Sequence, residues 1–465
     1  MVANGCGRRW RRWGLKSASS WNVAPIAWGA IGVLWVLALW HSWECRGLFW
    51  DGASFLADIV LEQNFLLFDP SRRHVVFLVE IPVVAAIWLG VDDLHWLARW
   101  WSLGMFGVPT ALYTLAVLRA RNDAMILAAT IAAIAMVFMT TSFFIVGEYN
   151  TAHAAAIVAA VWLATTDRPD VGSGIVLVAI AVIALRSYET FLWLGPLLAL
   201  MTAWTIWRAP SRPALATGLY AAATLLFLGA TVVQAHALLI QRDDPYLAYV
   251  LARRWDFRWN RQLMLLLAAA AVVLVWGLVR PDDLRRRRPY FWAGILLVLV
   301  ALSPLLFFLK VLVGAPYAYP QHAARIAGGG IVAVVIVFMW ANRLPALAVL
   351  KSPEASRRFV AFAGLMLLAM VPWDIFLTRL YSLYLDEVRA TIRGQSGVIV
   401  LEGSRLDQHP NLWQGDQWTL PSLSLVLRSR PGDGILQPPI DSLSWNELPF
   451  TLSAPPDLGR YVWRE

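Results

Sequence analysis

The sequence LFWDGASFLADIVLEQ, residues 48–63, follows the first long apolar run of the chain and opens a stretch that extends to Gly90. If its middle part is helical, polar side chains lie along one side and apolar side chains along the other. The polar positions are Asp51, Ser54, Asp58 and Glu62, and the apolar positions are Leu56, Ile59 and Val60. This pattern favours a helix at a membrane surface that begins with a carboxylate. An ordinary surface helix after a solvated loop is the alternative.

The composition of the whole chain indicates its class. Of the 465 residues, 59% are hydrophobic and only 15% are charged, and the mean hydropathy is +0.58. These values are too apolar for a soluble globular protein. The 26 tryptophans agree, because the indole ring favours the membrane interface, where its N–H group stays hydrated. We therefore expect an all-α integral membrane protein.

The distribution of basic residues predicts the topology. Five basic residues before position 17 place the N-terminus in the cytoplasm by the positive-inside rule. The apolar run that follows is too long for a signal peptide and lacks a small-residue cleavage site, so it should remain as an anchor. Later basic clusters follow every second apolar segment, which gives about eleven spans by the twenty-residue criterion. The expected spans are residues 23–43, 99–118, 124–145, 151–166, 172–185, 190–207, 214–234, 263–279, 290–310, 326–341 and 359–377.

The apolar segment 75–89 is not counted as a span. It contains Glu80 and Pro82, and a full crossing there would place Arg119 and Arg121 outside, against the charge rule. We expect this segment to be re-entrant or juxtamembrane and to lie on the periplasmic face, like the helix that begins at Asp51.

The C-terminal residues 378–465 differ in composition from the apolar part, residues 1–377, and are expected to form a small periplasmic domain. They are rich in Pro, Asp, Gln and Ser, and strand-like pieces at 398–401 and 423–427 predict a mixed α/β fold. The segment HPNLWQGDQW, residues 409–418, is polar and aromatic, as sugar-binding surfaces are. A cap that only packs on the membrane domain is the alternative.

Motifs of soluble enzymes are absent from the sequence. It contains no Walker loop, no GxGxxG after a strand, no HExxH and no Cys or His cluster at metal-ligand spacing. We therefore expect no nucleotide cofactor and no nucleic-acid partner. Cys6 and Cys45 flank the first span, so they should lie on opposite faces of the membrane and cannot form a disulfide.

Ionisable residues are instead expected to gather at one membrane face. Charges in or near a membrane are costly unless they are paired or hydrated, so they are functional candidates. The group comprises Asp51, Asp58, Glu62, Glu80, Glu148, Arg186, Glu189 and His322.

Several short motifs carry a resemblance to a known family. The first span is followed by an acidic residue, an amphipathic helix, a half-buried segment with Pro82 and Trp88, and GVDDLHWLAR at 90–99. Later motifs are ALRSYETFLWLGPLLAL at 184–200 and PYAYPQHAARI at 316–326. Together they resemble the GT-C superfamily of glycosyltransferases that use polyprenyl-phosphate sugars, above all aminoarabinose transferases and protein O-mannosyltransferases. The chain carries Asp51-Gly52 where those enzymes have an acidic pair, and arginine at 186 where they commonly have lysine.

The resemblance implies a GT-C-like membrane fold and roles for particular residues. Asp51 would act as the general base, and Arg186 would bind the donor phosphate. Residues that would contact the acceptor or another part of the substrate are Glu148, Asp58, Glu189, Tyr319 and His322. A divalent cation is a possible cofactor, bound for example at Glu148.

Each role has a structural alternative. Asp51 could serve only as a helix N-cap, Arg186 could be paired with Glu189, and Glu148 could be an ordinary loop carboxylate. The aromatic and histidine side chains near residue 320 could be packing residues at the interface; they are Tyr317, Tyr319 and His322.

The expected function is an inverting glycosyltransferase of a bacterial inner membrane. It would transfer a sugar from a polyprenyl-phosphate donor to a glycan, lipid or protein acceptor on the periplasmic face. A transporter or lipid flippase is one alternative, and it predicts ionisable residues at mid-membrane depth in two related halves. A non-catalytic envelope-assembly subunit is another, and it would tolerate loss of the ionisable group.

Overall fold

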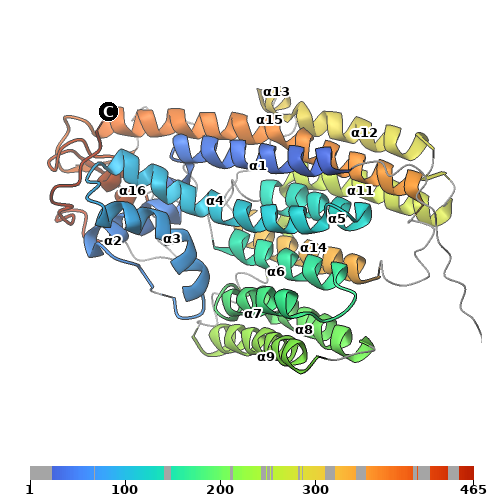
Figure 1. The fold of residues 1–465 in the computed structure, drawn as a ribbon. Helices are drawn as coiled ribbons and strands as arrows, with labels where there is room; N and C mark the ends of the chain where they lie inside the picture. Colours follow the sequence, from blue (N-terminus) through green and yellow to red (C-terminus); the bar gives the residue numbers. More distant parts are fainter. Residues whose placement is uncertain are drawn as a thin grey trace, which may run out of the picture.

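The fold was analysed in a computed structural model of the chain and is a long bundle of helices (Figure 1). The structure describes residues 23–67, 69–140, 148–209, 213–241, 248, 252, 255–280, 283–284, 286–308, 320–341, 352–401, 406, 419–437 and 450–464. Within these residues the secondary structure is helical, apart from an isolated bridge and two short parallel strands, β1 (Val398–Ile399) and β2 (Ile435–Leu436). The expected all-α class is therefore confirmed.

The helices follow one another with short connections. In chain order they are α1 (Ala24–Trp43), η1 (Arg46–Leu48), α2 (Asp51–Glu62), α3 (Arg73–Trp88), α4 (Leu94–Ala120), α5 (Ala124–Ala133) continued by the π-helical η2 (Ile134–Met139), α6 (Tyr149–Thr165), α7 (Val171–Leu185), α8 (Phe191–Arg208), α9 (Ala214–His236) continued by η3 (Ala237–Gln241), η4 (Asp256–Trp259), α11 (Arg261–Val279), α12 (Arg288–Ala301), α13 (Ser303–Phe308), α14 (Pro320–Ala341), α15 (Pro353–Ile392) and α16 (Leu420–Val426).

Four helices in the described part of the chain are long and apolar enough to cross a membrane. They are Ala24–Trp43, Leu94–Ala120, Ala214–Ile240 and Pro353–Ile392. Each of the eleven segments expected to span also contains a helix, although several are shorter than a full crossing requires. Large apolar side chains on the outside of the bundle, such as Val36 and Leu225, are more than 60% exposed, as expected for a surface that faces lipid.

One expected span is divided. The segment 290–310 forms α12 and then α13, with the break at Leu302. Pro304 lies in the first turn of α13, where its missing N–H group costs no helical hydrogen bond. This proline therefore fits the start of a new helix.

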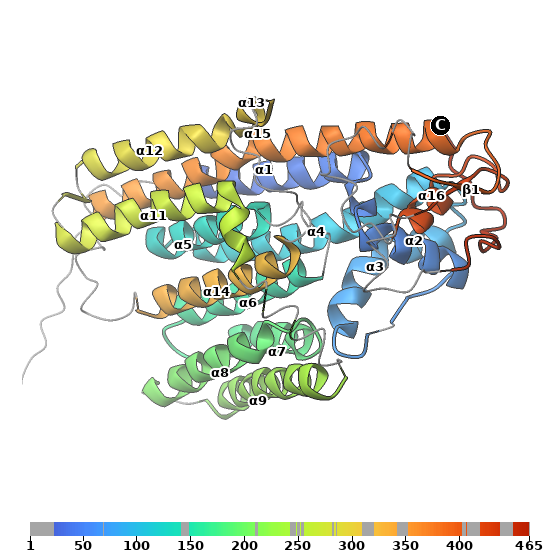
Figure 2. The ribbon, with the colours of Figure 1, turned by 180° about the vertical axis from the view of Figure 1, so that it is seen from behind.

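The bundle has layers (Figures 1 and 2). Helices α1, α4 and α15 form one side, α7, α8 and α9 form the opposite edge, and α6 and α14 lie between them. Helix α6 is the central element, because its side chains are buried except at Trp162 and Thr165. Small residues allow this packing: a Cβ atom added at Gly328 of α14 would lie 3.1 Å from the His153 ring of α6.

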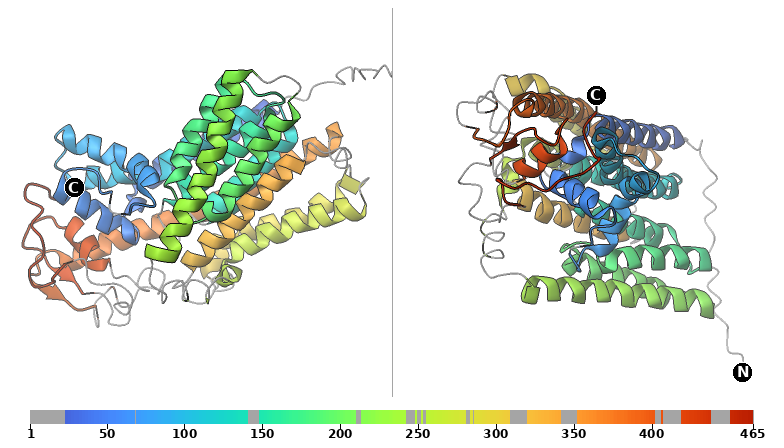
Figure 3. Two further views of the ribbon diagram at one scale, coloured as in Figure 1. Left: turned by 90° about the horizontal axis from the view of Figure 1, so that it is seen from below. Right: turned by 90° about the vertical axis from the view of Figure 1, so that its left-hand side faces the viewer.

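One end of the bundle carries an additional layer, which we call the polar end. It consists of α2, α3, α16, the first part of α4 and the last part of α15 (Figure 3). The segment expected to be re-entrant or juxtamembrane forms α3 at this end, packed against α4 and α7. The packing on α4 requires glycine at 104, because a Cβ atom there would lie 1.8 Å from the Val79 carbonyl oxygen.

Helix α15 joins the bundle to the C-terminal segment. It continues without interruption to Ile392, so the expected domain boundary after residue 377 lies inside this helix. The described C-terminal residues then form α16 and the β1–β2 pair. The strand expected at 398–401 is present as β1, whereas the expectation of a strand at 423–427 is wrong, because these residues lie in α16 and its C-cap. The segment 409–418 lies outside the described residues.

Candidate functional site

A buried arginine organises the polar end. Arg72, the N-cap residue of α3, forms its closest ion pair with Glu189 and further ion pairs with Asp69 at 3.3 Å and Glu148 at 3.9 Å. Its guanidinium carbon also lies 4.8 Å from the centre of the Tyr188 ring. One cation therefore joins the α2–α3 loop, the start of α6 and the α7–α8 turn. We call these five residues the Arg72 cluster.

Hydrogen bonds hold the Arg72 segment in place. The Ser71 backbone N–H and hydroxyl both donate to an Asp69 carboxylate oxygen, and the Gln234 side chain of α9 donates to the Ser71 carbonyl oxygen at 3.0 Å. The His74 backbone N–H donates to the Arg186 carbonyl oxygen at 3.0 Å. The α2–α3 loop is thus fixed to α9, and the first turn of α3 to the α7–α8 turn.

The charge of Arg72 is stabilised by its partners. Burial by itself would lower the pKa of Arg72, but the carboxylate of Glu189, the Tyr188 phenol and the carboxylates of Glu148 and Asp69 raise this pKa well above its ordinary value. Arg72 is therefore a permanent cation that faces three carboxylates.

Glu80 of α3 is a buried carboxyl group beside this cluster. It is 1% exposed, and its Oε2 atom accepts a hydrogen bond from the Leu66 backbone N–H at 2.8 Å. Burial raises the pKa of Glu80 to about 8; the Leu66 hydrogen bond lowers it, and the nearby Glu148 carboxylate raises it further. Glu80 is thus largely protonated at neutral pH.

Arg186 differs from Arg72 in its surroundings. It is the C-cap residue of α7 and is partly buried. Among the residues that the structure describes, its guanidinium makes no ion pair. The alternative of an Arg186–Glu189 pair is therefore wrong, because Glu189 is bound to Arg72.

Asp51 is the first residue of α2 and is partly exposed. The N-cap position is taken by Trp50, which has a positive φ of 53°, so Asp51 itself is not the N-cap. A bulky residue in this backbone conformation is strained, and such strain persists where the surroundings enforce it. The next residue of α2, Gly52, approaches the preceding loop closely, since a Cβ atom there would lie 1.8 Å from the Gly47 carbonyl oxygen.

Asp58 lies two turns after Asp51 on the same helix and is partly exposed. Burial, followed by the neighbouring Glu62 carboxylate, raises the pKa of Asp58. Helix α2 packs against α4, η1 and α16.

A second buried arginine precedes α2. The Arg46 guanidinium donates to Thr378 at 2.9 Å and to Asp374 at 3.2 Å, both in α15, and contacts the His41 ring of α1. Arg46 is also within electrostatic reach of Tyr149, the residue after Glu148. The loop that leads to Asp51 is therefore anchored to α15 and lies near the start of α6.

The structure brings some expected site residues together and not others. Glu148 and Glu189 meet at Arg72, and the Arg186 carbonyl oxygen accepts a hydrogen bond from the first turn of α3, which follows Arg72. Tyr319 lies outside the described residues, as does the side chain of His322, whose backbone belongs to the first turn of α14. Sequence reasoning overlooked Arg72, Arg46 and Asp374; a charged residue inside an apolar helix, as Asp374 is, was the available signal, since it requires a partner.

No three His, Cys, Asp or Glu side chains in the described ranges are grouped closely enough to hold a metal ion. The described residues at and beside the polar end do offer three groups: a cation without an ion pair among them at Arg186, a carboxyl group that is largely protonated at Glu80, and a carboxylate at the start of α2. Comparison with family models, with curated proteins and with solved structures found no match for this chain.

Proposed function

We propose that the chain is an inverting, GT-C-like glycosyltransferase that takes its sugar from a polyprenyl-phosphate donor. The observation that carries this proposal is the state of Arg186: a partly buried arginine at the end of an apolar helix, without an ion pair among the described residues. A cation at the edge of a membrane without a protein counter-ion is suited to an anionic group, and guanidinium binds phosphate through several charge-assisted hydrogen bonds.

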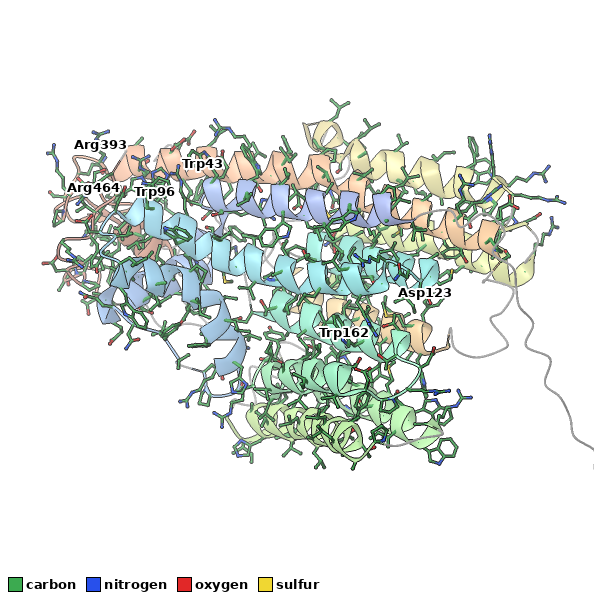
Figure 4. The ribbon with its side chains drawn as sticks, viewed as in Figure 1. Trp43, Trp96, Asp123, Trp162, Arg393 and Arg464 are labelled. Carbon is green, nitrogen blue, oxygen red and sulfur yellow. The ribbon has the colours of Figure 1, made fainter. Side chains whose placement is uncertain are left out.

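The proposed topology places the polar end in the periplasm of a bacterium and the N-terminus in the cytoplasm, with about eleven spans of the inner membrane. Interfacial aromatic residues support two opposite membrane surfaces (Figure 4). At the polar end, the Arg99 guanidinium lies 3.8 Å from the Trp43 ring centre and 4.7 Å from that of Trp96. Toward the other end, Arg119 lies 5.5 Å from the ring centre of Trp162. Such arginine and tryptophan pairs are typical of membrane interfaces.

In the proposed reaction, Arg186 binds the phosphate of the donor and Asp51 accepts the proton of the acceptor hydroxyl. The acceptor oxygen forms a bond to the anomeric carbon as the bond from that carbon to the phosphate oxygen breaks. The configuration at the anomeric carbon is inverted, and polyprenyl phosphate leaves with the bonding electrons. Contacts with the acceptor are assigned to Asp58 of α2, Glu148, Tyr319 and His322. A divalent cation that takes part in the reaction would bind Glu148.

Asp51→Asn tests the assigned base. Asparagine keeps the shape of the side chain but cannot accept the proton. We expect the variant to fold and insert normally but to transfer sugar about 10²–10⁴ times more slowly. The measurement is transfer of labelled sugar from lipid donor in membranes with matched protein amounts.

Glu62→Gln is the matched control, because Glu62 is an exposed carboxylate on the same helix and is assigned no contact with the substrate. It should retain most of the transfer rate. Near-normal transfer by Asp51→Asn would show that Asp51 is not the general base, and Glu148 would be the next candidate for that role.

A further inference from the structure

The α7–α8 turn contains two opposite charges with different partners. Arg186 and Glu189 are three residues apart in one short turn, a spacing at which a long arginine side chain can reach a carboxylate. Glu189 is nevertheless bound to Arg72 of another segment, and this is the closest contact in the Arg72 cluster. The ion pair with Arg72 therefore engages Glu189, which could otherwise pair with Arg186 and neutralise its charge.

Several contacts fix the turn in this arrangement. The Tyr188 ring lies against the Arg72 guanidinium, and the buried Ser187 hydroxyl donates to the Ala184 carbonyl oxygen. The His74 backbone N–H binds the Arg186 carbonyl oxygen. The turn is therefore held from residue 186 to residue 189, with Glu189 on Arg72.

The cluster has more negative than positive charge. Arg72 faces the carboxylates of Asp69, Glu148 and Glu189. Because Asp69 and Glu148 lie farther from the guanidinium, Glu189 is the carboxylate that Arg72 holds most closely. If Arg72 lost its charge, Glu189 would be a poorly hydrated anion whose nearest alternative cation along the chain is Arg186.

We propose that Arg72 is a positioning residue: it holds Glu189 away from Arg186 and so keeps the Arg186 guanidinium available for the phosphate of the lipid donor. This inference rests on the proposed function, and it assigns Glu189 to Arg72 instead of to the acceptor. The inference gives the buried Arg72 a role beside the phosphate site, because that site needs the Arg186 guanidinium to remain unpaired.

The test measures binding of a short-chain polyprenyl monophosphate to the full-length protein in lipid nanodiscs, by calorimetric titration. Arg186→Gln should weaken binding about 10-fold or more, because charge-assisted contacts are lost. Arg72→Gln should also weaken binding about 10-fold, because Glu189 then pairs with Arg186. Glu189→Gln alone should bind the phosphate at least as tightly as the wild type.

The decisive variant is the double substitution Arg72→Gln with Glu189→Gln. It removes both the holding cation and the competing anion, so binding should return to within about 3-fold of the wild type, a strong departure from additivity. A double variant that binds as weakly as Arg72→Gln would mean that Arg72 only supports the loop structure, and the inference would be wrong. Unchanged binding by Arg72→Gln would also overturn it.

Arg72→Lys provides a test that does not depend on a neutral variant folding. Lysine keeps a positive charge near Glu189, so binding should stay within about 3-fold of the wild type. A 10-fold loss that Glu189→Gln does not restore would contradict the inference. The outcome for Arg186→Gln separates the two proposals: unchanged binding there refutes the phosphate role of Arg186, whereas weakened binding without rescue refutes only the role of Arg72.

Discussion

Glu80 couples its ionisation to the docking of the α2–α3 loop, because its carboxylate oxygen binds the Leu66 backbone N–H. Its pKa is about 8 in the folded protein, against an ordinary value of 4.5. Between these two pH values the folded state binds more protons than the unfolded state. The stability contributed by Glu80 is therefore fully present below about pH 4.5 and is lost as the pH rises toward 8.

Glu80→Gln should remove this pH dependence while preserving the hydrogen bond, since the glutamine amide oxygen can accept from Leu66. Relative to the wild type, the variant should be more stable at pH 8 than at pH 5, by an amount on the order of a few kcal/mol. Thermal unfolding at the two pH values in the same detergent measures the difference. Glu62→Gln, an exposed substitution on α2, is the control and should leave the pH dependence as it is.

The residues that sequence analysis identified carry a local signal that Arg72, which it overlooked, does not. Glu80, Glu148, Arg186 and Glu189 stood out because each is a charge in or beside an apolar segment. Arg72 lies in a polar loop, where an arginine looks solvated. Its burial depends on contacts with residues 148 and 189, and no local pattern in a single sequence reveals contacts over such distances.

At the scale of elements, hydropathy located the helices but not their full extent. The expected span 99–118 is part of α4, which begins at Leu94, and the expected span 359–377 is part of α15, which ends at Ile392. Helix α15 also begins at Pro353, before its expected span, so it is extended at both ends. The additional turns carry charged residues and leave the apolar pattern. A twenty-residue apolar window detects only the apolar part of such a helix, so its polar extensions are missed.

The first turn of α4 is held by the end of the chain. The Asp93 side chain accepts hydrogen bonds from the backbone N–H groups of His95 at 2.9 Å and Arg464 at 3.1 Å. The Leu94 N–H donates to the Val462 carbonyl oxygen at 3.0 Å, and the Trp463 ring stacks on His95 at 4.6 Å. Asp93 thus caps α4 and also holds the C-terminal segment through Arg464.

Asp93→Ala should therefore loosen both segments. The loss of an N-cap typically costs about 0.5–2 kcal/mol, and we expect faster amide hydrogen exchange at His95 and Arg464 with little change in the middle of α4. Asp92→Ala is the matched control, because Asp92 pairs with the partly exposed Arg464 side chain and caps no helix. Equal effects of the two substitutions would contradict the assigned capping role.

At the scale of the whole molecule, segments that are far apart in the sequence contact one another at the polar end. Helix α15 crosses the bundle and ends beside α16, and the C-terminal residues return to the start of α4. If α1 begins in the cytoplasm and crosses the membrane once, the polar end, which includes α2 and α3, must lie on the other side of the membrane. The C-terminal segment must lie there too. The orientation of the chain therefore decides where the proposed site lies.

Thiol labelling in intact cells tests this orientation in a background without the native cysteines, Cys6→Ser with Cys45→Ser. Ser453→Cys introduces an exposed thiol in the C-terminal segment, and Asn122→Cys introduces one between α4 and α5 at the opposite end. The positive-inside rule, applied to the basic residues at the N-terminus and around α4, predicts that Ser453→Cys reacts with an impermeant reagent supplied from the periplasm. Asn122→Cys should react only after the cells are opened. The reverse result would place Arg186 and Asp51 on the cytoplasmic face, where the proposed transfer of a sugar to a periplasmic acceptor could not take place.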